Sequence, residues 1–276
     1  DIIAKISTNL NKNNSSDKLN NISIEDINKE ISSTNVFLKM NPPGKIFNGD
    51  KIIINENPNL LNILVIDCGI KNSQLRALLK RNIQLTVVDL NYNFINEVFN
   101  NKYNGIFISN GPGNPIHSTN VISQLKQIFT RNHSIPIFGI CYGHQLIGLA
   151  GGFNVEKMKY GNRGHNIPCN LVGTEKCYIT SQNHGYEVLL KNNNVYDNLL
   201  NWKELFVNCN DGSNEGLISL NKPIFSVQFH PEARAGPTDT TFLFDIFIDR
   251  CKSEFSINDR INSRVKESIK DSVEYV

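Results

Sequence analysis

Apolar runs of strand length alternate with helix-like segments through the middle of the chain, and this alternation restricts the fold more than any other feature. The runs are apolar at consecutive positions, as in NILVID and GIFIS. Consecutive apolar residues are typical of parallel strands that are covered on both faces. The expected strands are Asn62–Asp67, Gln84–Leu90, Gly105–Ser109 and Ile135–Ile140, and the expected helices are Lys71–Arg81, Phe94–Phe99, Ser118–Phe129 and Tyr142–Ala150. The pattern predicts an α/β fold with a doubly wound, largely parallel central sheet and helices on both faces.

The chain carries more strand signals after residue 165. Short apolar or alternating segments follow one another there, separated by Gly, Asn and Pro. A last amphipathic helix is expected at Thr241–Cys251, where Phe, Leu and Ile cluster. The expected strands are Tyr178–Thr180, Leu205–Cys209, Gly216–Leu220 and Pro223–Phe229. We therefore expect additional β-strands in the C-terminal half of the fold.

Composition divides the chain into three parts. Residues 9–36 are rich in Asn, Ser and Lys, and their few apolar residues cannot offset the entropy lost on ordering, so this segment is predicted to be a linker or insertion. Met40–Asp50 is rich in turn residues, and we expect the folded body to begin near Leu60. The predicted parts are a junction over residues 1–59, one domain over residues 60–252 and a charged tail over residues 253–276.

Because the chain begins with Asp1 rather than Met, we expect it to be cut from a longer protein.

Charge and hydropathy exclude several classes of protein. The net charge is +2 at pH 7, so no long-range field favours nucleic acid or a membrane surface as a partner. No apolar run approaches the ~20 residues that a transmembrane helix needs. Since the sequence also shows no signal peptide, we expect a cytoplasmic protein.

Six cysteines are scattered along the chain without a CxxC pair. Such spacing predicts neither a disulfide framework nor a zinc site. Apart from Cys141, we expect them to be buried, reduced thiols: Cys68, Cys169, Cys177, Cys209 and Cys251.

Cys141 lies in the motif Gly139–Gly143 (GICYG), where a predicted strand meets a predicted helix. This is the cysteine counterpart of the G-x-S-x-G nucleophile elbow, in which a sharp turn strains the backbone at the nucleophile and flanking glycines avoid clashes. The turn also places the sulfur at a helix N-terminus, which favours the thiolate. Taken alone, the motif fits a buried structural cysteine equally well.

Two further segments with chemical potential follow predicted strands. His230 and Glu232 are two residues apart, so in an extended segment they point to the same side, with Pro231 fixing the backbone between them. Glu232 would then steady the His230 imidazole during proton transfer, although a surface loop with a local ion pair is the alternative. Gly111–Pro115 (GPGNP) offers N–H groups to an oxyanion, or forms a plain tight turn.

The order of these motifs resembles the class I, triad-type glutamine amidotransferases over about residues 60–250. The resemblance rests on ISNGPGNP, FGICYGHQLIGLAGG and FSVQFHPEA. KMKYGNRGHN and SQNHGYEV are similar to the glutaminase domain of glutamine-hydrolysing carbamoyl phosphate synthetases. IAKIST and NPPGKIFNGD also resemble the end of the preceding small-subunit domain and its junction. The Asn-rich stretch would then be an insertion in that junction, and the charged tail would lead toward the synthetase part.

The resemblance implies a role for each motif residue. Cys141 would attack the glutamine side-chain amide, His230 would serve as base and acid, and Glu232 would orient His230. Gly113 and the backbone N–H of Tyr142 would form the oxyanion hole. The implied glutamine-binding residues are Gly111, Gly113, Tyr142, Gln145, Asn183, Gly185 and Tyr186.

Two of these positions depart mildly from the usual pattern of the family. Tyr142 stands where Leu is usual and Tyr186 where Phe is usual. Neither change removes a catalytic group.

The resemblance also implies partners and excludes a cofactor in this domain. L-glutamine is the expected substrate, and no metal or organic cofactor is needed. ATP and magnesium would belong to an ATP-grasp synthetase part, in the same longer chain or in a separate subunit, within pyrimidine or arginine synthesis. The alternatives are the glutaminase domain of another class I amidotransferase, a free-standing γ-glutamyl hydrolase, or a non-catalytic docking module of the same fold.

Overall fold

The protein is described here by a computed structural model. The expected linker at residues 9–36 and the expected tail at residues 253–276 lie outside the described residues. The structure describes residues 45–48, 51–131, 134–190, 197–234 and 236–252.

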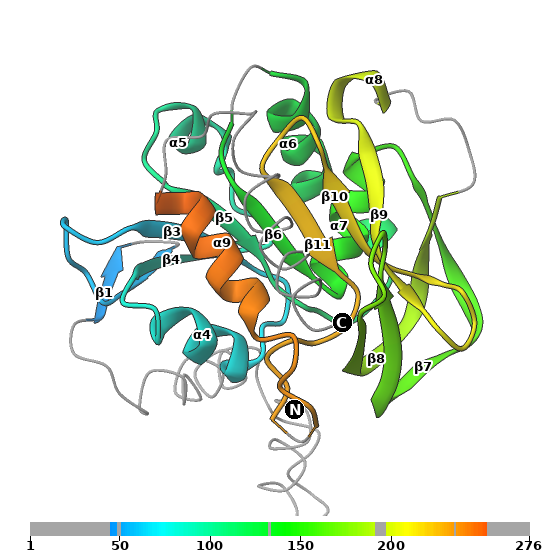
Figure 1. Ribbon diagram of the computed structural model, residues 1–276. Coiled ribbons are helices and arrows are strands. Elements are labelled where there is room, and N and C mark those ends of the chain that lie inside the picture. The colour runs from blue at the N-terminus through cyan, green and yellow to red at the C-terminus, as the bar shows by residue number, and fades with distance from the viewer. Residues whose placement is uncertain (1–44, 49–50, 132–133, 191–196, 235, 253–276) are drawn as a thin grey trace, which may run out of the picture. The chain divides into compact units, whose positions relative to one another are not determined.

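One mixed sheet of 11 strands organises the described residues (Figure 1). Its strands are β1 (Lys45–Asn48), β2 (Lys51–Ile54), β3 (Asn62–Asp67), β4 (Gln84–Asp89), β5 (Gly105–Ile108), β6 (Ile137–Ile140), β7 (Asn154–Leu171), β8 (Cys177–Leu189), β9 (Trp202–Asn208), β10 (Asn214–Ser219) and β11 (Ile224–Val227). The order across the sheet is β1-β2-β4-β3-β5-β6-β11-β10-β9-β7-β8. Strands β4, β3, β5, β6 and β11 pair in parallel, and the flanking strands pair antiparallel. The predicted parallel centre and the additional strands of the C-terminal half are both present.

Helices cover both faces of the parallel strands, as the apolar pattern predicts. In Figure 1, α4 and α9 lie in front of the sheet, whereas α6 and α7 lie behind it. The helices are α4 (Asn72–Leu79), α5 (Ile95–Phe99), α6 (Thr119–Thr130), α7 (Tyr142–Ala150), α8 (Asp197–Leu200) and α9 (Phe242–Lys252), with a short 3-10 helix η2 (Pro115–His117).

The core has two layers because successive strand residues point to opposite faces. Phe107 and Phe138 face α9, and their ring centroids lie 5.6 Å apart. Phe138 also stacks on Phe225 at 4.4 Å and contacts Phe244 of α9 at 5.7 Å. Burial of each Phe side chain stabilises the folded state by about 1.5–3 kcal/mol relative to an exposed side chain. The layer on the other face includes Ile106, Ile108, Ile137, Leu125, Leu146 and Ile147.

The sheet begins before Leu60, which corrects the expected start of the folded body. Strand β2 pairs antiparallel with β4, and β1 pairs with β2. The strands are short and stand beside turn-rich sequence, and the pairing partner of β2 lies more than 30 residues away. Local composition does not reveal such an edge pairing.

Strands β7 and β8 are longer than expected. They form an antiparallel ribbon that extends to the right in Figure 1, whereas the sequence predicts only the short strand Tyr178–Thr180 there. Many residues of β7 are exposed, so the ribbon lacks the apolar alternation that marks a half-buried strand.

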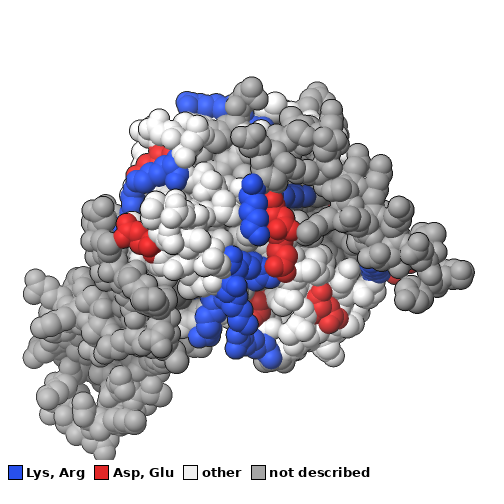
Figure 2. Space-filling view, turned by 60° about the vertical axis from the view of Figure 1, so that its left-hand side comes forward, with Lys and Arg blue, Asp and Glu red and all other residues white. Residues whose placement is uncertain are grey.

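Charges of both signs lie next to one another on the surface drawn in Figure 2. Arg81 and Asp245 form an ion pair at 2.7 Å that joins the region of α4 to α9. This mixture matches the small net charge of the chain. No helix of the described residues is long and apolar enough to cross a membrane.

We predict that Gly143→Ala destabilises the fold by about 1–3 kcal/mol. A Cβ at Gly143 would lie 2.3 Å from the carbonyl oxygen of Ile108, so α7 would have to move away from β5. Glycine-to-alanine changes inside helices otherwise stabilise the fold by up to about 1 kcal/mol. A loss of stability in Gly143→Ala would therefore indicate the close contact between α7 and β5.

Urea unfolding of Gly143→Ala beside Gly164→Ala measures this effect. A Cβ at Gly164 would meet its nearest atom at 3.4 Å, which makes that variant a matched control. Equal or greater stability of Gly143→Ala would show that the close packing of α7 on β5 is not required.

Candidate active site

Cys141 occupies the turn between β6 and α7. Its φ is +55° and its ψ is −100°, a conformation that residues with a side chain rarely adopt. Its N–H donates to the carbonyl of Val227 on β11 at 2.8 Å, which fixes the turn to the neighbouring strand. The residue is 6% exposed, and its sulfur lies at the start of α7. The strained turn therefore presents the thiol at a helix N-terminus, where N–H groups have no partner within the helix.

His230 lies beyond the end of β11 and contacts both Cys141 and Glu232. The ring Nδ1 of His230 lies 2.8 Å from Oε1 of Glu232. The backbone N–H of His230 donates to the backbone carbonyl of Ser181 at 2.8 Å. Since Nδ1 faces the carboxylate, Nε2 remains for the thiol. Burial lowers the pKa of His230, but the hydrogen bonds and charges of Cys141 and Glu232 outweigh it and raise the pKa to about 9.

Glu232 is a buried carboxylate held by two partners. Burial raises its pKa, but the hydrogen bond and positive charge of His230 outweigh this effect and lower the pKa below its ordinary value. The second partner is Gln74 of α4, whose Nε2 donates to the same Oε1 at 3.1 Å. Gln74 is fully buried. The sequence does not reveal this role, because a single Gln beside apolar helix residues carries no signal of its own.

The loop after β5 lies beside the start of α7. A Cβ on Gly111 would lie 2.1 Å from the carbonyl oxygen of Cys68, so only glycine fits there. Gly113 has a φ of +95° and open space where its Cβ would be. The Tyr142 hydroxyl lies 2.8 Å from the hydroxyl of Ser118, which ties α7 to this loop. The Tyr that departs from the family pattern thus fastens the glycine loop to the nucleophile turn.

The predicted binding residues of β8 also lie at this site. The carbonyl oxygen of Asn183 is 3.9 Å from the sulfur of Cys141. Gln145 of α7 donates from Nε2 to the carbonyl of Tyr186 at 3.3 Å. Asn183 is exposed, and Gly185 and Tyr186 are half-buried, so the segment has a face open to a ligand. The structure thus places the predicted residues of α7 and β8 together.

Two cysteines depart from the expected burial. Cys177 and Cys209 are exposed, and their sulfurs lie 3.8 Å apart as free thiols. Cys177 begins β8 and Cys209 follows the last residue of β9, so both stand at strand ends. Cys68, Cys169 and Cys251 are buried as expected, and burial raises the pKa of all three.

The arrangement has the parts that acyl transfer needs. A thiol contacts a basic imidazole, a carboxylate orients that imidazole, and N–H groups at a helix start and a glycine loop lie nearby. Within the described ranges, no group of three or more His, Cys, Asp and Glu is placed to hold a metal ion.

The sequence matches the family model of the class-I glutamine amidotransferases over residues 64–250. This match covers more than half of the chain, so the chain belongs to that family.

The curated relatives of this chain include small chains of carbamoyl phosphate synthase and multifunctional proteins. The arginine-specific small chain of carbamoyl phosphate synthase from Candida albicans is 51% identical over 189 residues, or 68% of this chain and 42% of the relative. The corresponding chain from Saccharomyces cerevisiae is 46% identical over 220 residues, or 78% of this chain and 50% of the relative. Multifunctional protein ura1 from Schizosaccharomyces pombe is 51% identical over 70% of this chain and 8% of its own length. The chain thus spans half or less of these relatives.

Solved structures support the fold. A Thermoplasma acidophilum protein named for one chain of GMP synthase matches with a TM-score of 0.59 at 21% identity, covering 71% of this chain and 96% of that chain. A glutamine amidotransferase from Thermotoga maritima matches with a TM-score of 0.50 at 16% identity, covering 70% and 84%. At these identities the likeness concerns the fold alone.

We predict that excess glutamine slows alkylation of Cys141 by limiting iodoacetamide. The exposed Cys177 and Cys209 serve as internal controls that glutamine leaves unchanged. Cys68 and Cys251 should react most slowly, because burial raises the pKa of each thiol. Mass-spectrometric peptide mapping measures all five sites at once. Unprotected Cys141, or faster labelling of Cys68, would contradict the assignment of the nucleophile.

We predict that Glu232→Gln lowers the pKa of His230 from about 9. The carboxylate stabilises the protonated ring, so its removal favours the neutral ring at a lower pH. A histidine-selective NMR titration follows this directly, with His230→Asn used to assign the signal. An unchanged or higher pKa in Glu232→Gln would show that Glu232 does not support the charge on His230.

Proposed function

We propose that this chain hydrolyses glutamine through a γ-glutamyl thioester on Cys141 and delivers the ammonia to a carbamoyl phosphate synthetase part. The observation that carries the proposal is the buried contact of Cys141 with His230, whose ring is held by Glu232 at 2.8 Å. Family membership and the identities of 46–51% to carbamoyl phosphate synthase chains and a multifunctional protein support the same assignment.

The chemistry follows from the roles of three side chains. The sulfur of Cys141 attacks the amide carbon of glutamine, and His230 gives a proton to the leaving nitrogen, which departs as ammonia. Water then attacks the thioester while His230 accepts its proton, and glutamate is released. Glu232 keeps the His230 ring in place and balances its charge in both steps.

The backbone around the nucleophile supports the oxyanion. Gly113 and the N–H of Tyr142 stabilise the negative oxygen that forms in each step, because helix-start and loop N–H groups are fixed before the reaction. Glutamine is held by residues of the β5 loop, α7 and β8. These residues are Gly111, Gly113, Tyr142, Gln145, Asn183, Gly185 and Tyr186.

The synthetase partner supplies the rest of the reaction. Names of the relatives include both small chains and multifunctional proteins, which supports a partner in a separate subunit or in the same longer chain. ATP and magnesium act in that partner, and glutamine hydrolysis itself requires neither. We place the enzyme in the cytoplasm, within pyrimidine or arginine synthesis.

A glutaminase of another class I enzyme is the nearest alternative. The structure named for GMP synthase shares 21% identity, far below the 51% shared with a carbamoyl phosphate synthase chain. Stimulation of glutamine hydrolysis by a carbamoyl phosphate synthetase core separates the two functions.

We predict that Cys141→Ala abolishes carbamoyl phosphate formation from glutamine in the full-length protein. Formation from ammonium salts should continue at a near wild-type rate, because external ammonia bypasses the thioester. Both rates are measured as carbamoyl phosphate produced, with the exposed Cys177→Ala as the control that keeps both activities.

The two other outcomes each contradict part of the proposal. Glutamine-dependent synthesis in Cys141→Ala would show that Cys141 is not the nucleophile. Loss of both activities in a folded variant would show that this residue serves the synthetase rather than glutamine hydrolysis.

A further inference from the structure

A second buried carboxylate, Glu215, lies behind Asn183–Tyr186, the segment of β8 that contains predicted glutamine-binding residues. Its side chain is fully buried, and the register between β9 and β10 shifts between Asn214 and Gly216, the two residues that flank it. Such a bulge re-aims a side chain, and bulges are common beside active sites. Burial raises the pKa of Glu215, against the opposing contacts of His184 and Asn208. Burying a carboxylate costs free energy unless the group is paired and hydrogen-bonded, so the contacts of Glu215 matter.

Glu215 faces one edge of the His184 ring. Its Oε1 lies 3.7 Å from Nε2 of His184 and accepts a hydrogen bond from Nδ2 of Asn208 at 3.2 Å. Both His184 and Glu215 have side chains no more than 1% exposed. The carboxylate and the imidazole therefore restrain one another within the protein.

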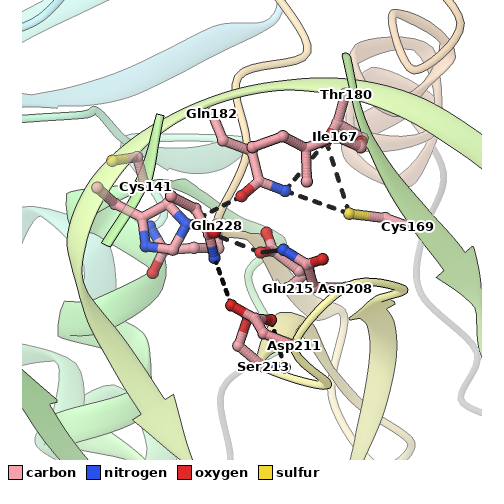
Figure 3. A network of polar contacts seen from close by, with 12 residues as sticks. Cys141, Ile167, Cys169, Thr180, Gln182, Asn208, Asp211, Ser213, Glu215 and Gln228 are labelled. Atoms are coloured by element: carbon pink, nitrogen blue, oxygen red, sulfur yellow. Dashed lines mark hydrogen bonds and ion pairs between the residues drawn. The ribbon is translucent and has the colours of Figure 1, made fainter. Parts of the chain in front are cut away.

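Gln182 fixes the same edge of the ring from a second direction. Figure 3 shows its amide turned toward Cys169 and Thr180, to which Nε2 donates at 3.3 and 3.1 Å. Because the Nε2 of Gln182 donates to these two residues, the Oε1 of Gln182 is turned toward His184. It lies 3.1 Å from the Nε2 of the His184 ring. The ring cannot rotate without breaking this arrangement.

The opposite edge of the ring reaches the candidate glutamine site. Nδ1 of His184 lies 2.9 Å from the carbonyl oxygen of Tyr186 and must donate, because a carbonyl oxygen only accepts. Gln145 donates to the same carbonyl at 3.3 Å. His184 is itself the residue between Asn183 and Gly185, so its orientation sets the path of the segment that borders Cys141.

The geometry points to Glu215 as a positioning residue for glutamine. Glu215 holds the His184 ring so that Nδ1 donates to the Tyr186 carbonyl, and this bond fixes the Asn183–Tyr186 segment against which glutamine rests. The inference relies on the proposed glutamine hydrolysis and adds to it a residue that never touches the substrate. Its loss should weaken glutamine binding and leave the chemistry at Cys141 nearly unchanged.

Steady-state kinetics of glutamine hydrolysis in the full chain tests this role. We predict that Glu215→Leu raises the KM for glutamine about tenfold, the effect of one well-placed hydrogen bond, while kcat stays within about threefold. Glu215→Gln should keep KM near the wild-type value, because its amide still contacts His184 and Asn208. A merely structural role would lower the active fraction, and so the apparent kcat, with KM unchanged.

Two further variants sharpen the result. Glu204→Leu is the matched control, because Glu204 lies on neighbouring β9 and accepts a hydrogen bond from Asn214 at 2.9 Å instead. His184→Phe should raise KM as Glu215→Leu does, and the double variant should be no worse than either one, since both act through one contact. If Glu215→Leu does not fold, Glu215→Asp replaces it, because the shorter side chain withdraws the carboxylate from the ring.

The outcomes separate this inference from the proposed function. Wild-type protein that does not hydrolyse glutamine overturns the proposed function. Wild-type activity with an unchanged KM in the folded Glu215→Leu or Glu215→Asp variant overturns the positioning role alone. Independent, additive effects of Glu215→Leu and His184→Phe also overturn it.

Discussion

The turn between β6 and α7 depends on a backbone contact that leaves no room for a side chain. A Cβ at Gly143 would lie 2.3 Å from the Ile108 carbonyl oxygen, and one at Gly139 would lie 2.7 Å from the backbone of Gly143. These contacts let α7 begin directly against the sheet, and Cys141, in the turn between the two glycines, has a φ of +55°. Every other group of the candidate site is placed relative to that strained residue, whose cost the surrounding packing offsets.

Burial decides the electrostatics of the site. His230 and Glu232 are 4% and 5% exposed, so each would lose its charge if it were alone. Together they stay charged, as the raised pKa of His230 and the lowered pKa of Glu232 both indicate. Gln74 anchors the carboxylate from α4, a helix far from β11 in the sequence. The geometry of the candidate site thus depends on the packing of α4 as much as on the local sequence around His230.

Sequence reasoning succeeds where residues act through local patterns and fails where tertiary packing decides. Apolar runs predict β3, β4, β5 and β6 because both faces of these strands are buried. The glycines around Cys141 predict the turn because such a sharp turn leaves no room for a Cβ at the flanking positions. By contrast, β2 becomes a strand only through pairing with the distant β4. Gln74 and Glu215 are single polar residues, and only the fold shows that they are buried beside the site.

The central claim is that Cys141 forms a covalent γ-glutamyl thioester, and trapping that species tests it most directly. Wild-type protein is mixed with isotopically labelled glutamine, quenched in acid during turnover and mapped by mass spectrometry. The account predicts one labelled glutamyl group on the peptide that contains Cys141, and none on the peptides of Cys177 or Cys209. Label on another cysteine, or turnover without label on any cysteine, would contradict it.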